Sequence, residues 1–184
     1  MIDRVALSRS GLVTSRLGFG TSRLHYSDSK TRALLLETAV DLGLTHIDTA
    51  PAYGDTLAER EIGNVLRGKR DRLVIATKYG IPPNSLVSAV PFLAFPLRAG
   101  RTVLRKVVSR DVARPLMTPY GLRVSLERSL RHLRTDWVDI LLLHEPTLAT
   151  IAGPEPTHSF QLKTRISSHA LRNGLRSSDV TSRG

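Results

Sequence analysis

The sequence contains no cysteine among its 184 residues, which excludes disulfide bonds and thiolate metal sites. It also lacks a long apolar run. The longest near-apolar stretch, residues 86–97, contains two prolines and is shorter than the roughly 20 residues that a membrane-spanning helix needs. The first residues carry no apolar core of the kind found in signal peptides. These absences predict a soluble, cytoplasmic protein with no membrane partner.

Aromatic side chains make up only 5% of the residues, whereas positive charge is abundant, with a net charge of +11. Residues 98–134 hold ten basic and two acidic side chains, and therefore most of this excess. Such a segment is compatible with binding to nucleic acid or to an acidic partner. Its arginines fall opposite leucines in a helical pattern, however. We therefore expect a solvated helical surface and no nucleic-acid partner.

The residues that are present predict a short hairpin followed by alternating strands and helices. Val5-Ala6-Leu7 and Leu12-Val13, on either side of a turn that Gly11 closes, predict the hairpin. Apolar runs predict strands, and capping residues followed by a period of about 3.6 predict helices. The predicted strands cover residues 17–20, 44–48, 72–78 and 137–144, and the predicted helices begin after Ser27 or Asp28, after Asp55, and at Thr118-Pro119.

Each predicted helix has one apolar face. Glu59 and Glu61, early in the second helix, suit the positive end of its dipole. Continuous apolar strands that alternate with amphipathic helices indicate an α/β fold, in which helices cover a parallel sheet. The predicted buried positions are Leu35, Ala39 and Leu42 in the first helix, Ala58, Ile62, Val65 and Leu66 in the second, and Leu122, Leu126, Leu130 and Leu133 in the third.

Three of the predicted strands end in an ionisable residue: Asp48, Lys78 and His144. The carboxyl ends of parallel strands meet at one edge of a barrel, so we expect these side chains to converge there with Tyr53 from the following loop. Each residue alone has a structural explanation, such as a turn cap for Asp48 or a snorkelling stem for Lys78. Four such groups at one rim favour a functional site.

Four sequence motifs carry a resemblance to a known family. "GFGTSRLH", "HIDTAPAYG", "VIATKYG" and "LRVSLERSLRHLRTDWVDILLLHEP" occur in this order and resemble the aldo-keto reductases, NADPH-dependent enzymes with a (β/α)₈ barrel. The resemblance implies a barrel of the TIM type, of which about the first four βα units are present here. It also implies that small-molecule aldehydes or ketones are the substrates.

The resemblance assigns roles residue by residue. It implies a catalytic tetrad of Asp48, Tyr53, Lys78 and His144. It implies that Gly20, Thr21 and Asp48 contact the NADPH cofactor, and that His25 and His144 contact the substrate. Residues 81–116 match an inserted loop that shapes the substrate pocket in this family.

The chemistry explains why these residue types belong together. Hydride transfer to a carbonyl carbon leaves negative charge on the oxygen, which must then receive a proton. A phenol is a slow donor unless its anion is stabilised, and an ammonium group beside Tyr53 would stabilise that anion. Asp48 would hold the Lys78 ammonium in place, and a neutral His144 imidazole would donate a hydrogen bond to the carbonyl oxygen.

Other chemical classes lack their motifs. The sequence has no Gly-x-Gly-x-x-Gly and no Gly-x-x-x-x-Gly-Lys loop, so neither a Rossmann nor a P-loop nucleotide site is indicated. None of the six histidines forms the i, i+4 pair around a carboxylate that is typical of helical zinc sites. No metal is therefore expected.

The resemblance ends near Pro146. We expect residues 1–146 to form the N-terminal half of a barrel, and residues 147–184 to form a divergent, poorly ordered tail of a truncated chain, with one weak helix over 160–171. A half-barrel has open sheet edges, which predicts possible self-association. The alternative function is a catalytically inactive fragment that acts through association of its basic segment, residues 98–134, with a partner.

Overall fold

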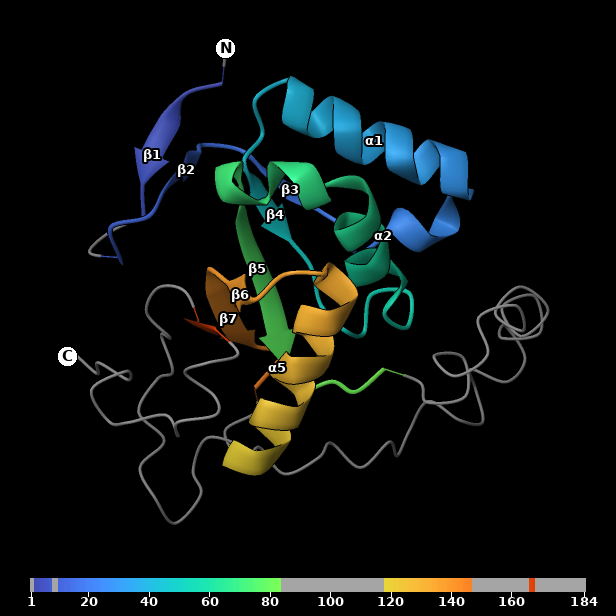
Figure 1. The fold of residues 1–184 in the computed structure, drawn as a ribbon, viewed down its shortest axis with the longest axis vertical. Coiled ribbons are helices and arrows are strands. Elements are labelled where there is room, and N and C mark those ends of the chain that lie inside the picture. The colour runs from blue at the N-terminus through green and yellow to red at the C-terminus, as the bar shows by residue number, and fades with distance from the viewer. Residues whose placement is uncertain (1, 8–9, 84–117, 147–165, 168–184) are drawn as a thin grey trace.

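A computed structural model describes residues 2–7, 10–83, 118–146 and 166–167 of the chain (Figure 1). The predicted hairpin is confirmed: strands β1 (Arg4–Ala6) and β2 (Val13–Ser15) pair antiparallel, with Val5 opposite Thr14. The buried Thr45 hydroxyl accepts a hydrogen bond of 2.8 Å from the Ser15 backbone N–H. This bond attaches the hairpin to the end of the fold at which the sheet begins.

The centre of the molecule is a four-stranded parallel sheet in the order β3-β4-β5-β7. Its strands are β3 (Gly18–Gly20), β4 (His46–Asp48), β5 (Val74–Tyr79) and β7 (Ile140–Leu143). Gly20 lies opposite Asp48, and Asp48 opposite Ala76. Within the described residues the sheet is open, so the α/β fold of partial-barrel type predicted from the sequence is confirmed.

Three α-helices follow strands in sequence: α1 (Ser29–Asp41), α2 (Leu57–Val65) and α5 (Pro119–Leu133). Two of the predicted caps are confirmed. The Asp28 carboxylate accepts from the Thr31 N–H at 3.0 Å, and the Thr118 hydroxyl accepts from the Gly121 N–H at 3.1 Å. The prediction that Asp55 caps α2 is wrong, because Asp55 itself adopts φ 56° and the N-cap position is Thr56, whose side chain makes no capping bond.

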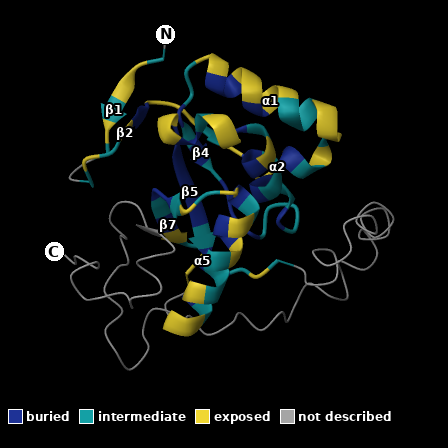
Figure 2. Ribbon diagram, in the orientation of Figure 1, coloured by how far each residue is buried: buried dark blue, intermediate teal, exposed yellow. Residues whose placement is uncertain are grey.

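All three helices pack on one face of the sheet, and Figure 2 shows the buried positions concentrated between them and β5. Successive residues of a strand point to opposite faces. Ile47, Ile75 and Leu141 face the helices. Asp48 directly follows Ile47, and Lys78 lies three residues after Ile75, so both face the opposite side. The helix side of the core is made by Leu36, Val40, Ile62, Leu66, Leu122, Leu126, Leu130 and Leu133.

The predicted buried face of α1 is partly wrong. Leu36, Ala39 and Val40 are buried, whereas Leu35 is 42% exposed and Leu42 is 64% exposed. This helix has leucines on more than one side, so its apolar period alone did not define the direction in which it packs. On α2 the prediction holds for Ala58, Ile62 and Leu66, and Val65 packs at the edge of the core. All four predicted leucines of α5 are buried.

Helices α2 and α5 approach each other closely. A Cβ atom on Gly63 would lie 2.7 Å from the Leu133 carbonyl carbon and closer still to the His132 carbonyl oxygen. The glycine therefore allows the two helices to contact each other through their backbones. Arg123, Arg128 and Arg131 are exposed on the outer side of α5, as expected for a solvated surface.

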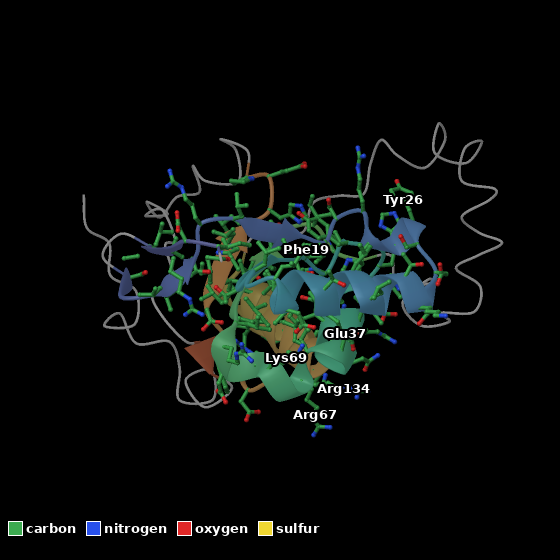
Figure 3. All side chains as sticks on the ribbon, turned by 90° about the horizontal axis from the view of Figure 1, so that it is seen from above. Phe19, Tyr26, Glu37, Arg67, Lys69 and Arg134 are labelled. Atoms are coloured by element: carbon green, nitrogen blue, oxygen red, sulfur yellow. The ribbon has the colours of Figure 1, made fainter. Side chains whose placement is uncertain are left out.

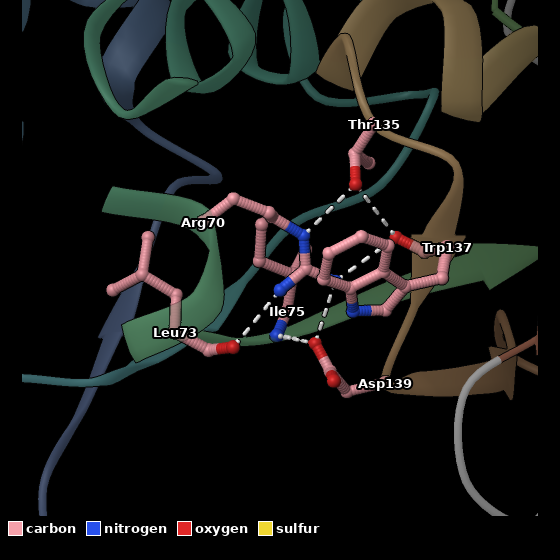
Figure 4. A network of polar contacts seen from close by, with 6 residues as sticks. All are labelled: Arg70, Leu73, Ile75, Thr135, Trp137 and Asp139. Carbon is pink, nitrogen blue, oxygen red and sulfur yellow. Dashed lines mark hydrogen bonds and ion pairs between the residues drawn. The ribbon is translucent and has the colours of Figure 1, made fainter. Parts of the chain in front are cut away.

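A buried polar network lies at the amino-terminal end of β5 (Figure 4). Arg70, in the 3₁₀ helix η3 (Arg67–Arg72), forms a 2.7 Å ion pair with Asp139. The same guanidinium donates to the carbonyl oxygens of Leu73 and Trp137, both at 2.9 Å, and lies 4.5 Å from the centre of the Trp137 ring. The Asp139 carboxylate also accepts from the Ile75 N–H at 2.9 Å.

Two residues of the tail are described. Ile166–Ser167 form strand β8, which pairs antiparallel with β6 (Trp137–Val138). At these positions the predicted helix over 160–171 is wrong. The predicted helical surface of residues 98–117 and nearly all of the predicted insertion, residues 81–116, lie outside the described residues. Across the described ranges, no helix has the length and apolar character needed to cross a membrane.

Candidate active site

The carboxyl ends of β4 and β5 bring Asp48 and Lys78 together on the face of the sheet away from the helices. The Lys78 Nζ lies 2.7 Å from both carboxylate oxygens of Asp48 and donates a further bond of 3.0 Å to the Thr49 carbonyl oxygen. The Lys78 side chain is 13% exposed and the Asp48 side chain 35% exposed. The ammonium group is therefore fixed by three oxygen atoms while one side of the pair stays open to solvent.

Tyr53 lies in the loop between β4 and α2, directly beside this ion pair. The Lys78 Nζ is 4.7 Å from the centre of the Tyr53 ring. The loop is tightly folded, because the Tyr53 N–H donates to the Ala50 carbonyl oxygen at 3.0 Å and the Tyr53 carbonyl oxygen accepts from the Ala58 N–H at 3.2 Å. The Tyr53 phenol is therefore positioned by a turn that connects β4 to α2.

The turn after Tyr53 contains three successive residues with left-handed backbone. These are Gly54 at φ 63°, Asp55 at φ 56° and Thr56 at φ 73°. Only glycine adopts this region freely, and a β-branched residue such as Thr56 is an outlier there. Backbone strain of this kind concentrates at functional sites, where the surrounding structure maintains it.

His144 follows β7 and completes the group. Its backbone N–H donates to the Tyr79 carbonyl oxygen at 2.7 Å, which places it beside the end of β5. The His144 and Tyr53 rings meet edge to face, with centroids 5.7 Å apart and an interplanar angle of 89°. The structure thus brings together all four residues that the sequence placed at the rim: Asp48, Tyr53, Lys78 and His144.

Gly20 and Thr21, at the end of β3, lie next to Asp48. The Thr21 backbone N–H and hydroxyl both donate to the Asp48 carbonyl oxygen, at 3.0 and 2.9 Å. Thr21 is fully buried, so these bonds fix the end of β3 against the end of β4. Gly20 differs, since a Cβ atom there would meet nothing within 4 Å. Open space therefore adjoins the Asp48–Lys78 pair on the β3 side.

His25, in the 3₁₀ helix η2 (Leu24–Tyr26), borders the Tyr53 turn. A Cβ atom on Gly54 would lie 2.6 Å from the His25 Cβ, so His25 packs directly on the residue that follows Tyr53. Its ring lies 4.1 Å from the ring of Tyr26, which is 77% exposed and projects at the outer end of the molecule (Figure 3). The predicted substrate residue His25 therefore lies beside the four residues Asp48, Tyr53, Lys78 and His144, which we call the rim group.

His46 is a further titratable group on the same face of the sheet as Asp48 and Lys78, two residues before Asp48. Burial lowers the pKa of His46, because desolvation disfavours the charged imidazolium. The charges of Asp48 and Asp139 oppose this effect, and that of Lys78 adds to it. A neutral imidazole is consequently favoured beneath the rim.

Two polar residues near the site were not predicted from the sequence. The Thr49 carbonyl oxygen is the third acceptor for Lys78, a role that no side-chain pattern reveals. Glu59, which the sequence analysis assigned only to the helix dipole, is fully buried. A signal was present, since Glu59 lies between Ala58 and Ile62 on the apolar face of α2. In the described part of the chain, no group of three or more potential metal ligands occurs.

The arrangement offers a fixed cation beside a phenol, an imidazole ring perpendicular to the phenol ring, and open space at Gly20. Such a group is suited to donating a proton to an atom that gains negative charge, because the ammonium stabilises the phenolate that forms. It is equally suited to orienting a polar substrate atom between two ring side chains.

Comparisons with known proteins show the family of the chain. The sequence model of the Aldo/keto reductase family matches residues 16–157, and so extends beyond Pro146. Aldo-keto reductase YhdN of Bacillus subtilis is 31% identical over 124 residues, which cover 65% of this chain and 29% of that protein.

Solved structures give the same fold. A holo-form aldo-keto reductase of Bacillus halodurans has a TM-score of 0.64 at 23% identity, over 86% of this chain and 44% of that one. An aldo-keto reductase from Klebsiella pneumoniae in complex with NADPH has a TM-score of 0.54 at 25% identity, over 78% and 40%. The chain thus spans less than half the length of each of these three relatives. Because the family model covers most of its residues, the chain belongs to the aldo/keto reductase family.

Proposed function

We propose that the rim group reduces small-molecule aldehydes or ketones with NADPH, and that Tyr53 is the proton donor. One observation carries the proposal: the Lys78 ammonium lies between the Asp48 carboxylate, at 2.7 Å, and the ring of Tyr53, at 4.7 Å. A cation this close to the phenol ring would stabilise the phenolate that forms when the phenol gives up its proton.

Each residue has a defined part in this reaction. NADPH, when bound, would supply the hydride to the carbonyl carbon. Tyr53 then gives its hydroxyl proton to the carbonyl oxygen, and Lys78 balances the charge of the tyrosinate until solvent returns a proton. Asp48 holds Lys78 in place. The imidazole of His144, at the edge of the Tyr53 ring, orients the carbonyl oxygen by a hydrogen bond, and His25 contacts the substrate from the far side of the Tyr53 turn.

The described residues fit the reactive end of the cofactor. The space beside Gly20 adjoins Asp48 and Lys78, so a planar ring could approach the backbone there without meeting a side chain. Asp48 would border that ring, and the buried Thr21 would hold the end of β3 beside it. The NADPH complex of the Klebsiella pneumoniae relative supports the choice of nucleotide. The cytoplasmic location remains a prediction from the sequence.

The open sheet bears on whether the chain associates with a second copy of itself. Among the described strands, β3 and β7 are its two edges, and Leu34 and Leu35 of α1 and Leu42 at its C-cap are all more than 40% exposed. Unpaired strand edges and exposed leucines favour association with another chain. We therefore propose self-association through the open edges, which sedimentation velocity at increasing protein concentration tests; a concentration-independent monomer would contradict it.

The alternative, an inactive fragment that binds a partner through residues 98–134, is not favoured by the family match. The part of that segment in α5 is an ordinary solvated helix face, with its leucines in the core. Strongly salt-dependent binding of the purified chain to DNA, together with no response to NADPH, would restore this alternative.

The experiment for the main proposal compares the purified chain with its Tyr53→Phe variant. NADPH is titrated while nicotinamide fluorescence is followed, and reduction of an aromatic aldehyde is then measured by the loss of NADPH absorbance. We expect both proteins to bind NADPH and the variant to lose about 10²–10⁴-fold in rate, the usual contribution of a positioned acid. Equal rates for the two proteins would show that Tyr53 is not the donor.

A further inference from the structure

The most unusual group outside the proposed mechanism is the carboxylate of Glu59, which is fully buried in the first turn of α2. Its two oxygens contact two other elements. Oε1 accepts a 2.8 Å hydrogen bond from the Thr77 hydroxyl on β5, and Oε2 lies 3.4 Å from Nδ1 of His132 on α5. One carboxylate therefore joins three elements of the core.

Each of these three elements is connected along the backbone to a residue of the rim. Thr77 directly precedes Lys78 in β5. Glu59 follows Ala58, whose N–H donates to the carbonyl oxygen of Tyr53 at 3.2 Å. His132 lies at the end of α5, which leads into the strand that ends before His144. Every link in this chain of contacts is a backbone connection or a hydrogen bond of the structure.

The direction of the side chains explains how the contact acts at a distance. Thr77 faces the helices and Lys78 faces the opposite side, because successive strand residues alternate. On the rim side, Lys78 is held by Asp48 and Thr49. On the helix side, Glu59 holds Thr77 against α2. Thr77 and Lys78 are thus each held on their own face of the sheet. Helix α2 also holds the end of the Tyr53 turn, through the hydrogen bond from Ala58 to Tyr53.

We propose that Glu59 is a positioning residue that sets the contact between Tyr53 and Lys78. The proposal rests on the function given above, since that contact matters because Lys78 stabilises the tyrosinate. Glu59 itself does not touch the reacting atoms. It acts through α2 and β5, whose relative position decides how far the phenol lies from the ammonium.

A role in stability alone would not favour this residue type. Removing a carboxylate from water is costly, and replacing buried polar groups by apolar residues of similar volume is often neutral or stabilising. Apolar residues at all three positions, 59, 77 and 132, would fill the same space without that cost. A buried carboxylate with two directional partners gives orientation instead, which is the property that a proton-donor site requires.

The test is a nuclear Overhauser measurement on the full chain, which reports the proximity of the Tyr53 ring protons and the Lys78 ε-methylene protons. We compare the parent with Glu59→Met, and with Glu61→Met as the matched control. Glu61 is on the same helix but pairs with Arg32 of α1 at 2.9 Å instead of contacting β5 or α5. Urea unfolding of each protein separates a loss of stability from a loss of position.

We expect the parent and Glu61→Met to show the Tyr53–Lys78 cross-peak and folded Glu59→Met to lose it. Retention of the cross-peak in folded Glu59→Met overturns the proposal, as does its absence from the parent. If Glu59→Met does not fold, Thr77→Val replaces it, because valine keeps the shape of threonine and removes only the donor to Glu59. The same loss is then expected, and retention again overturns the proposal.

The cross-peak does not depend on NADPH, so the two proposals can fail separately. A cross-peak that Glu59→Met abolishes, in a chain that reduces no carbonyl, would contradict the proposed function and leave the positioning role intact. In an active chain, we expect Glu59→Met to lower kcat about 10- to 100-fold, with KM unchanged, as small misplacements of reacting groups do. An equal fall in kcat for Glu61→Met would contradict a specific role of Glu59.

Discussion

Two ion pairs, Lys78–Asp48 and Arg70–Asp139, lie at opposite ends of the same strand, β5, and are equally short at 2.7 Å. Their surroundings differ. The Arg70 and Asp139 side chains are only 10% and 6% exposed, and further hydrogen bonds from Arg70 go to Leu73, Trp137 and Thr135. The Asp48 side chain is 35% exposed and adjoins the open space at Gly20.

The difference separates structure from function. A charge pair that is buried from solvent and bonded to several protein groups holds elements together: Arg70 in η3 bonds the Trp137 carbonyl oxygen of β6, and its partner Asp139 bonds the Ile75 N–H of β5. A charge pair at the carboxyl ends of parallel strands, with one side open, can act on a ligand. The proposed activity therefore belongs to the end of β5 that carries the less buried pair.

The largest expected effect is a loss of stability when the Arg70 pair is broken. Arg70→Met leaves the Asp139 carboxylate buried without its cation, and we expect the free energy of unfolding to fall by about 3–5 kcal/mol. Urea denaturation measures it. The control is Lys69→Met, which removes a pair with Asp41, 70% exposed, and should cost at most about 1 kcal/mol. Equal losses for the two variants would contradict a special role for the Arg70 network.

A smaller loss is expected from crowding the contact between α2 and α5. Gly63→Ala would place a methyl group against the backbone at His132 and Leu133, and we expect it to cost about 1–3 kcal/mol, as overpacking in a core does. Gly68→Ala is the control, because a Cβ atom on Gly68 meets nothing within 4 Å. If the urea midpoints of Gly63→Ala and Gly68→Ala fell by the same amount, the close contact between α2 and α5 would not require a glycine at position 63.

The smallest effect concerns pH. Burial lowers the pKa of His46 in the folded chain, so near and below about pH 6.5 the unfolded chain binds more protons than the folded one. The stability that the neutral His46 contributes is therefore complete above that pH and is lost as pH falls toward the folded pKa. His46→Gln should flatten this part of the curve of unfolding free energy against pH. Parallel curves for parent and variant would contradict the assignment.

The sequence was most informative about features that depend on residues close together in the chain. Alternating strands and helices predicted the parallel sheet, and Thr118-Pro119 predicted the start of α5, because caps and apolar periods are local. Polar residues at the ends of three apolar runs predicted the rim group, since parallel strands end at one edge. These predictions needed no knowledge of which elements contact each other.

The sequence was least informative where a residue's partner lies far along the chain. Leu35 and Leu42 could not be distinguished from Leu36 and Val40 without knowing the direction in which α1 packs. The position of Glu59 on the apolar face of α2 indicated burial, but its partners, Thr77 and His132, lie far along the chain and could not be predicted. The left-handed backbone at Thr56 likewise follows from the fold of the turn and not from the residue.

The comparison of the two ion pairs is tested most directly by Lys78→Met, measured for unfolding free energy and for NADPH-dependent carbonyl reduction on the same preparation. The account predicts a reduction rate lower by about 10²–10⁴-fold, with a smaller loss of stability than Arg70→Met causes, because the Asp48 carboxylate left behind is 35% exposed. A variant that unfolds as readily as Arg70→Met, or one that reduces carbonyls at the parental rate, would contradict the functional assignment of the Lys78–Asp48 pair.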